Sequence, residues 1–230
     1  MSSPLLSPIV AIVPAAGVGK RMGSVQPKQY LTIHGRAILS YTLECLLNHS
    51  AISEVVVAIG PEDDAFAQLP EASHPKLRPV IGGAERADSV RCALATVPAE
   101  AWVLVHDAAR PCLHPQDIDN LLQQCGDQGA ILAMPVRDTM KRSNGSGHIT
   151  ATVERADLWH ALTPQLFPAQ ALSQALIQFA GDNRITDEAS AMELCGWQPQ
   201  LVLGRADNLK ITHPDDLRLA QLYLGQQERV

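Results

Sequence analysis

The sequence predicts an α/β protein of one domain, in which helices surround a mostly parallel central sheet and a β-hairpin arm projects from it. Short apolar runs rich in Val and Ile alternate with longer stretches of helical period, which is typical of strand–helix–strand units. Several of these runs are continuously apolar, as expected of strands that are buried on both faces. With 230 residues, 46% of them hydrophobic, the chain can fill one substantial core.

Six apolar runs are expected to form the strands of the sheet. They are residues 9–13, 54–59, 77–81, 102–106, 130–134 and 200–203. Helices are expected between them, and several begin with a proline near the first turn, where its missing N–H is not needed. The expected helices are residues 38–48, 86–96, 115–125, 168–179, 187–195 and 214–224.

One segment departs from this alternation. Residues 138–153 alternate polar and β-branched side chains about the pair Asn144-Gly145, a pattern that predicts a β-hairpin. Within a single domain of residues 1–230 we therefore expect a projecting arm over residues 138–163.

Composition argues against several classes of function. A formal charge of −6 leaves no broad basic surface for a nucleic acid. The five cysteines are widely spaced and include no C-x-x-C pair, as expected of reduced thiols rather than of disulfides or a zinc site. Residues 1–8 carry no Lys or Arg, and the apolar run after them is too short for a signal sequence or a membrane span. We expect a soluble, cytoplasmic protein with no membrane partner.

The loop after the first expected strand has the features of a phosphate site. Three glycines and three cations stand in or near it: Gly17, Gly19, Gly23, Lys20, Arg21 and Lys28. Backbone N–H groups at such glycines can approach an oligophosphate. A tight turn would explain the glycines alone, but the cations favour a triphosphate site. The glycine spacing fits neither a Walker A loop nor the dinucleotide fingerprint.

Motifs along nearly the whole chain, taken together, resemble those of one enzyme family. The first are Pro14-Ala15-Ala16-Gly17-x-Gly19-x-Arg21-Met22 and Pro27-Lys28-Gln29, which are similar to the N-terminal signature of nucleotidyltransferases that activate sugars and alditol phosphates. The others are Gly82-Gly83-Ala84-Glu85-Arg86-x-x-Ser89-Val90, Val105-His106-Asp107-Ala108-Ala109-Arg110-Pro111, Pro135-Val136-x-Asp138-Thr139, Thr163-Pro164-Gln165, Thr186-Asp187-Glu188-Ala189 and Gly204-x-x-x-Asn208-x-Lys210. In this order they resemble the 2-C-methyl-D-erythritol 4-phosphate cytidylyltransferase family.

The resemblance implies a Rossmann-like nucleotidyltransferase domain. Its members use CTP and a divalent cation such as Mg²⁺ to transfer CMP to a small polyol phosphate, and they release pyrophosphate, in non-mevalonate isoprenoid precursor synthesis. The resemblance also implies a homodimer in which each active site is shared between the subunits.

It further implies roles for individual residues. Those implied to bind the nucleotide are Ala15, Ala16, Gly17, Gly19, Gly83, Ser89, Asp107 and Ala108. The implied catalytic cations are Arg21, Lys28, Arg155 and Lys210, and the implied acceptor-binding residues are Arg110, Thr139 and Thr163. The segment with Gly83 and Ser89 would recognise cytosine. Ala84 differs from the acidic residue that some family members carry there, so only a backbone contact is expected at this position.

Several of these residues also have simpler interpretations. Gly83 and Ser89 fit a glycine turn and a helix cap, and Thr139, Arg155 and Thr163 fit a solvated hairpin.

Asp107 ends a buried strand, where open α/β sheets bind ligands, so it is expected to bind Mg²⁺ or ribose, with an Asx turn as the alternative. His106 is expected to be a hydrogen-bonded histidine rather than a metal ligand. The segment Thr186-Asp187-Glu188 is expected to be a capped helix start.

Three other functions stay open. The first is transfer to another polyol or sugar phosphate, such as ribitol 5-phosphate. The second is an NAD-linked oxidoreductase, which the glycine spacing disfavours. The third is a catalytically silent nucleotide-binding module.

Overall fold

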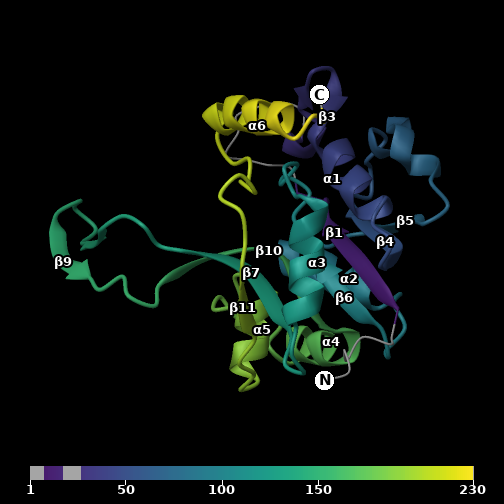
Figure 1. Ribbon diagram of the computed structural model, residues 1–230. Coiled ribbons are helices and arrows are strands. Elements are labelled where there is room, and N and C mark those ends of the chain that lie inside the picture. The colour runs from purple at the N-terminus through teal and green to yellow at the C-terminus, as the bar shows by residue number, and fades with distance from the viewer. Residues whose placement is uncertain (1–7, 18–26, 230) are drawn as a thin grey trace.

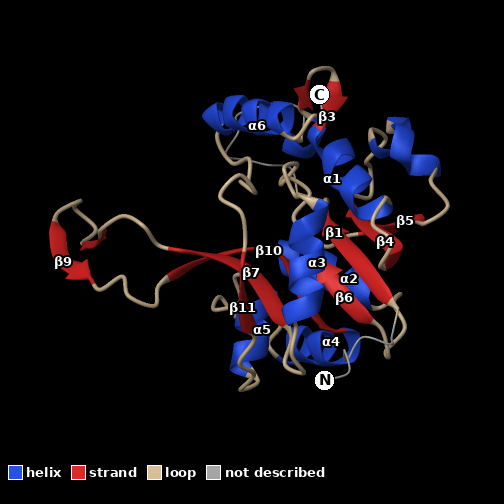
Figure 2. Cartoon of the chain, in the orientation of Figure 1, coloured by secondary structure: helices blue, strands red, loops and turns tan. Residues whose placement is uncertain are grey.

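The computed structural model describes residues 8–17 and 27–229. A seven-stranded sheet in the order β11-β7-β10-β6-β1-β4-β5 forms its centre (Figures 1 and 2). The strands are β1 Ile9–Pro14, β4 Ile52–Ile59, β5 Leu77–Ile81, β6 Trp102–Val105, β7 Ala130–Pro135, β10 Trp159–Pro168 and β11 Gln200–Leu203. Strand β10 runs antiparallel to both of its neighbours, whereas the other pairs of neighbouring strands are parallel.

Helices cover both faces of this sheet. They are α1 Ile38–Leu47, α2 Arg86–Leu94, α3 Pro115–Gln124, α4 Ala169–Gln178, α5 Glu188–Leu194 and α6 Pro214–Gln226. Along β1, Ile9, Ala11 and Val13 pack with residues of α1 and α3, whereas Val10 and Ile12 pack with residues of α2, α4 and α5. Because successive side chains of a strand point to opposite faces, a strand covered on both sides must be apolar throughout. This explains the continuous apolar runs of the sequence.

The expected elements are confirmed. Each of the six expected strands and six expected helices is present, and their ends differ from expectation by no more than two residues. Pro115 and Pro214 stand in the first turns of α3 and α6, as expected.

One strand of the sheet was not expected. Strand β10 contains Pro164 and Pro168, and proline is rare inside central strands because it cannot donate a ladder hydrogen bond. The pairing of β10 with β7 changes register between Ala161 and Gln165, and Pro164 lies in this break. The last part of the expected arm, residues 159–163, therefore belongs to the central sheet.

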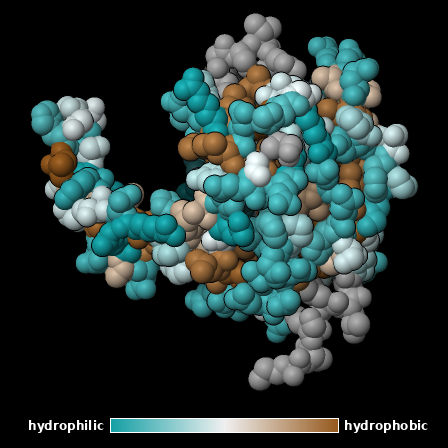
Figure 3. Space-filling model, turned by 45° about the horizontal axis from the view of Figure 1, so that its top comes forward, coloured by the Kyte–Doolittle hydropathy of each residue, from teal (hydrophilic) through white to brown (hydrophobic). Residues whose placement is uncertain are grey.

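The arm itself projects from the body of the domain (Figures 1 and 3). It consists of β8 Met140–Ser143 and β9 Ile149–Val153, which pair antiparallel, as the sequence pattern predicted. The side chain of Asn144 accepts the N–H groups of Ser146 and His148, which closes the turn. All residues from Met140 to Thr152 are exposed, so the arm has no core of its own.

A short hairpin and helix α6 form a small third cluster beside α1. The hairpin pairs β2 Thr32–Ile33 with β3 Arg36–Ala37. Among the described residues, 3-10 turns also span Lys28–Tyr30, Phe66–Gln68 and Pro70–Ser73. Tyr41 of α1 packs here against Ala220 and Leu224 of α6. In the described part of the chain, no helix has the length and apolar character needed to cross a membrane.

Candidate active site

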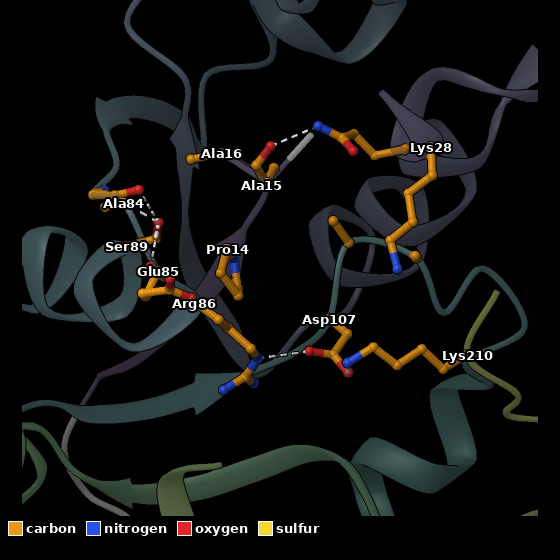
Figure 4. A pocket seen from close by; sticks show the side chains of 15 residues that line it. Pro14, Ala15, Ala16, Lys28, Ala84, Glu85, Arg86, Ser89, Asp107 and Lys210 are labelled. Carbon is orange, nitrogen blue, oxygen red and sulfur yellow. Dashed lines mark hydrogen bonds and ion pairs between the residues drawn. The ribbon is translucent and has the colours of Figure 1, made fainter. Parts of the chain in front are cut away.

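A cavity of about 270 Å³ lies at the carboxyl ends of β1 and β6, beside the start of α2 (Figure 4). Its lining consists of Pro14, Ala15, Ala16, Gly17, Lys28, Gln29, Gly83, Ala84, Glu85, Arg86, Ser89, Asp107, Ala108, Ala109 and Lys210. Open α/β sheets bind ligands at this edge, because the loops after parallel strands meet there.

The cavity brings together most of the expected nucleotide-binding residues. Those that line it are Ala15, Ala16, Gly17, Gly83, Ser89, Asp107 and Ala108, together with the expected catalytic cations Lys28 and Lys210. Gly19 and Arg21 lie outside the described residues.

Asp107 contacts three cationic side chains at the cavity. Its Oδ1 lies 2.9 Å from Nε of Arg86, and its Oδ2 lies 2.9 Å from Nζ of Lys210 and 3.3 Å from Nε of Arg110. Figure 4 shows Arg86 and Lys210 reaching Asp107 from either side. Burial alone would raise the pKa of Asp107, but the charges of Arg86, Lys210 and Arg110 outweigh it and hold the pKa well below its ordinary value. Asp107 is therefore a carboxylate at neutral pH.

Arg86, which is half-buried, and Glu188, which is buried, form an ion pair that the sequence did not predict. Arg86 donates from Nη1 and Nη2 to the two carboxylate oxygens of Glu188, at 2.7 and 3.0 Å. Glu188 is 1% exposed, so it needs such a partner. Asp187 caps α5 by accepting the N–H of Ser190, as expected of a helix start. Glu188, however, also holds the guanidinium of Arg86 at the cavity. Its position in the first turn of a helix does not indicate this role.

A chain of hydrogen bonds lies beneath Asp107. The N–H of Asp107 donates to Oγ1 of Thr163 at 3.1 Å, and Oγ1 lies 3.0 Å from Nδ1 of His106. Nε2 of His106 faces the carbonyl of Arg110, which can only accept, so Nε2 carries the proton and Nδ1 accepts the Thr163 hydroxyl. Burial lowers the pKa of His106 to about 4. His106 is therefore hydrogen-bonded, as expected, and its lowered pKa leaves it neutral at pH 7.

Arg110 and Thr163, both expected to bind the acceptor, do not line this cavity. Arg110 is 7% exposed and Thr163 is 4% exposed. Nη1 of Arg110 donates to the carbonyl of Asn208 at 2.7 Å, and Nδ2 of Asn208 donates to the carbonyl of Thr163 at 2.8 Å. In this structure both residues hold the loops that carry Asp107 and Lys210.

Close packing explains the glycines before α2. A Cβ atom on Gly82 would lie 2.7 Å from Cβ of Ala16 and 2.8 Å from Oγ of Ser89, and one on Gly83 would lie 2.3 Å from Cβ of Asp88. Ser89 Oγ accepts the N–H of Gly83 at 3.2 Å. The glycine turn tied to Ser89 is thus present, and it forms part of the cavity wall.

Thr139 and Arg155 lie on the arm and do not line the cavity. Both are exposed, and the guanidinium of Arg155 donates to the carbonyl of Arg137. Within one chain they are therefore not brought to the site.

A magnesium ion at this site would have few protein ligands, with Asp107 as the candidate among the described residues. The described residues contain no group of three or more His, Cys, Asp or Glu side chains arranged to hold a metal. Mg²⁺ often keeps water and substrate phosphate oxygens and takes one or two carboxylates. Asp107 Oδ1 accepts one hydrogen bond from the described part of the chain, from Arg86, so it retains capacity for such a contact.

Comparison with known proteins gives matches over nearly the whole chain. Residues 9–226 match the family model described as 2-C-methyl-D-erythritol 4-phosphate cytidylyltransferase. The protein of that name from Shewanella pealeana is 61% identical over 219 residues, which cover 94% of this chain and 95% of its own length. The one from Shewanella oneidensis is 60% identical over 224 residues, which cover 96% and 90%.

Solved structures show the same fold. A crystal structure of 4-diphosphocytidyl-2C-methyl-D-erythritol synthase is 39% identical with a TM-score of 0.83, and the match covers 96% of this chain and 99% of that one. The structure of 2-C-methyl-D-erythritol 4-phosphate cytidylyltransferase from Francisella tularensis is 33% identical with a TM-score of 0.81, covering 95% and 100%. Because sequence and structure agree over almost the full length, the chain belongs to the 2-C-methyl-D-erythritol 4-phosphate cytidylyltransferase family.

Proposed function

We propose that this chain transfers CMP from CTP to 2-C-methyl-D-erythritol 4-phosphate, releasing pyrophosphate and forming 4-diphosphocytidyl-2-C-methyl-D-erythritol. The observation that carries the proposal is the cavity at the ends of β1 and β6, which Lys28 lines and in which Arg86 and Lys210 contact Asp107. Family membership supplies the substrates, and the cavity supplies the cations that such a reaction needs.

The acceptor brings its own nucleophile. A phosphate monoester has a second pKa near 6, so it is largely a dianion at neutral pH and requires no general base. His106, the buried histidine next to Asp107, fits this scheme because both of its ring nitrogens are already hydrogen-bonded. The barrier lies in the repulsion between two anions and in the charge that builds up on the α-phosphoryl oxygens and on pyrophosphate.

Positive charge near those oxygens is therefore the main catalytic requirement. In the proposal Lys28 and Arg21 contact the α-phosphate and the leaving group, and Lys210 aligns the acceptor. Nζ of Lys28 donates to the carbonyl of Ile211 at 3.0 Å, which places this ammonium beside the segment that carries Lys210. Arg86, held by Glu188, adds a third positive charge to the wall of the cavity.

Magnesium would complete the charge balance. Asp107 would hold the ion together with the substrate phosphates, and the ion would neutralise part of the phosphate charge. Arg86 and Lys210, on either side of Asp107, keep the carboxylate ionised and fixed for that contact.

A homodimer with shared sites is the second part of the proposal. The arm carries exposed apolar side chains, with Ile149 66% exposed and Met140 38% exposed, and an arm without a core gains stability by packing against another subunit. Arg155 and Thr139 would then reach the partner's acceptor site.

The direct test is pyrophosphate release by the purified chain. CTP should support release only with 2-C-methyl-D-erythritol 4-phosphate, or strongly prefer it over ribitol 5-phosphate and other polyol phosphates, and only with Mg²⁺ present. UTP should react far more slowly, because a site built around the cytosine amino group leaves acceptors unpaired with uracil. Equal rates with ribitol 5-phosphate would shift the assignment within the class, and CTP binding without any release would favour a silent nucleotide-binding module.

A further inference from the structure

In the loop between β6 and α3, every backbone carbonyl from Asp107 to Leu113 accepts a hydrogen bond. It forms no helix or strand, yet it carries Asp107 and Arg110. The donors, in order along the loop, are the N–H of Arg110 to Asp107 (3.1 Å), Oγ1 of Thr42 to Ala108 (3.1 Å), the N–H of Ile211 to Ala109 (2.9 Å), Nε2 of His106 to Arg110 (3.2 Å), Nη1 of Arg229 to Pro111 (2.9 Å), Nε2 of Gln227 to Cys112 (3.0 Å) and Nη1 of Arg229 to Leu113 (3.1 Å).

Three of these hydrogen bonds come from two residues that follow α6, Gln227 and Arg229. The backbone of Glu228 has a φ of 55°, in the left-handed region, so it redirects the chain, and the N–H of Arg229 donates back to the carbonyl of Leu224. The side chains of Gln227 and Arg229 then reach the loop on either side of this turn.

The same two side chains also contact other parts of the domain. Nη2 of Arg229 donates to the carbonyl of Tyr41 at 2.6 Å and lies 3.5 Å from a carboxylate oxygen of Glu44, so the guanidinium joins α1 to the loop. Nε2 of Gln227 lies 3.4 Å from Oδ2 of Asp207, in the segment that leads to Lys210. Gln227 thus contacts both of the loops whose side chains form the Asp107–Lys210 ion pair.

We infer that Gln227 and Arg229 form a C-terminal clamp that positions Asp107 and Lys210 for catalysis. Neither residue lines the cavity, so they are positioning residues that act through the backbone of the loop. The inference rests on the proposed cytidylyltransferase activity, and it goes beyond that proposal by giving the end of the chain a part in catalysis.

Loss of the clamp should affect turnover more than nucleotide binding. Without the guanidinium, the carbonyls of Pro111 and Leu113 lose their donors in a buried segment, and the loop must shift to find others. A displacement of about 1 Å at the reacting groups can lower a rate by about 10²-fold. The segment from Gly82 to Ser89, which we assign to the base, has no contact with the clamp among the hydrogen bonds and ion pairs of the described residues.

The test compares Arg229→Ala, Arg229→Lys and Gln227→Ala with Arg218→Ala, whose arginine is exposed on α6. Turnover is measured per CTP-binding site, well below the unfolding temperature of each variant. Arg229→Ala should lower kcat about tenfold with less than about a twofold change in Kd for CTP. Arg229→Lys should recover part of the loss, Gln227→Ala should show a smaller loss, and Arg218→Ala should match the wild type. Amide hydrogen exchange should rise over residues 107–113 in Arg229→Ala, rise less in Gln227→Ala and stay at the wild-type level in Arg218→Ala.

The outcomes separate the inference from the proposed function. A wild-type chain that releases no pyrophosphate would defeat the proposed function, and hydrogen exchange would still report whether the clamp holds the loop. Arg229→Ala that keeps wild-type kcat per CTP site while its unfolding temperature falls would reduce Arg229 to a structural residue and overturn the clamp. If Arg229→Ala fails to fold, unchanged kcat in both Gln227→Ala and Arg229→Lys overturns it equally.

Discussion

The ammonium of Lys210 lies 2.9 Å from Oδ2 of Asp107, and this contact joins the loop after β11 to the loop after β6. The cavity that the pair lines has three positive side chains, Lys28, Arg86 and Lys210, and two negative ones, Glu85 and Asp107. Its described walls are therefore net positive in a chain whose formal charge is −6. Such a concentration of cations favours a polyanionic ligand in this cavity.

Replacing Lys28 by Ala should lower turnover far more than CTP affinity. A cation on charge that develops during the reaction stabilises the transition state more than the ground state. We expect kcat to fall on the order of 10²-fold, comparable to the loss of one oxyanion donor. Steady-state kinetics and calorimetric CTP binding measure the two effects. The control is Lys76→Ala, because Lys76 donates to the carbonyl of Ile52 and does not line the cavity. Weaker CTP binding with intact turnover would refute the role assigned to Lys28.

Replacing Glu188 by Ala should destabilise the fold and also impair the site. Arg86 would keep only Asp107 as a carboxylate partner, and breaking a buried pair leaves a poorly compensated charge. Because the side chain of Arg86 is 28% exposed, water can offset part of this loss, so we expect the unfolding free energy to fall by about 2–3 kcal/mol. Urea unfolding and turnover check both effects. Glu193→Ala, an exposed change on the same helix, should stay within about 0.5 kcal/mol of the wild type.

Hydrophobic patterning was sufficient to predict most of the fold. Strand β1 and the second half of β4, from Val55 to Ile59, are largely buried, so their apolar runs are unbroken. Strand β10 was not predicted, because Pro164 and Pro168 interrupt the apolar pattern of its sequence. Its pairing with β6 and β7 also depends on residues far away in the sequence.

For the site, motifs identified the residues but not all of their contacts. Lys28, Asp107 and Lys210 line the cavity as the resemblance implied. The Arg86–Glu188 ion pair was not predicted, because acidic residues are common in first helical turns whether or not they bind a cation. The sequence around Glu188 therefore does not indicate that it pairs with an arginine. Its burial, which makes the pair important, exists only in the folded chain.

The neutral state of His106 should make the fold sensitive to mild acid. Burial lowers its pKa from 6.5 to about 4. Between these two pH values His106 is protonated in the unfolded chain but not in the folded chain, so the unfolding free energy falls as the pH falls. Between pH 7 and pH 5 this contribution is about 2 kcal/mol. Asp117, whose pKa burial raises to about 6, acts in the opposite direction, so the comparison must be between variants.

The measurement is the unfolding free energy of His106→Gln and the wild type at both pH values. Gln can keep a donor toward the carbonyl of Arg110 but does not titrate. His106→Gln should lose about 2 kcal/mol less than the wild type on acidification. His148→Gln, on the exposed arm, should keep the wild-type dependence. Identical losses in His106→Gln and the wild type would refute a neutral His106.

The proposed sharing of sites between subunits predicts recovery of activity when two inactive variants are mixed. Arg155 lies on the exposed arm, whereas Lys28 lines the cavity of its own chain. Arg155→Ala and Lys28→Ala should each be nearly inactive alone. After random exchange of subunits about half of the dimers are mixed, and in each of these one site keeps Lys28 and receives Arg155 from the partner. Activity should therefore rise to roughly a quarter of the wild-type value.

A matched control follows from the cavity itself. Lys28 and Lys210 line the same cavity of one chain, so a mixture of Lys28→Ala and Lys210→Ala contains no complete site and should stay inactive under the same exchange conditions. Exchange is followed independently, by fluorescence transfer between labelled subunits. Recovery in the first mixture alone requires that Arg155 acts across the interface. If exchange is complete and neither mixture recovers, Arg155 serves its own subunit's site or none, and the sharing of sites between subunits is refuted.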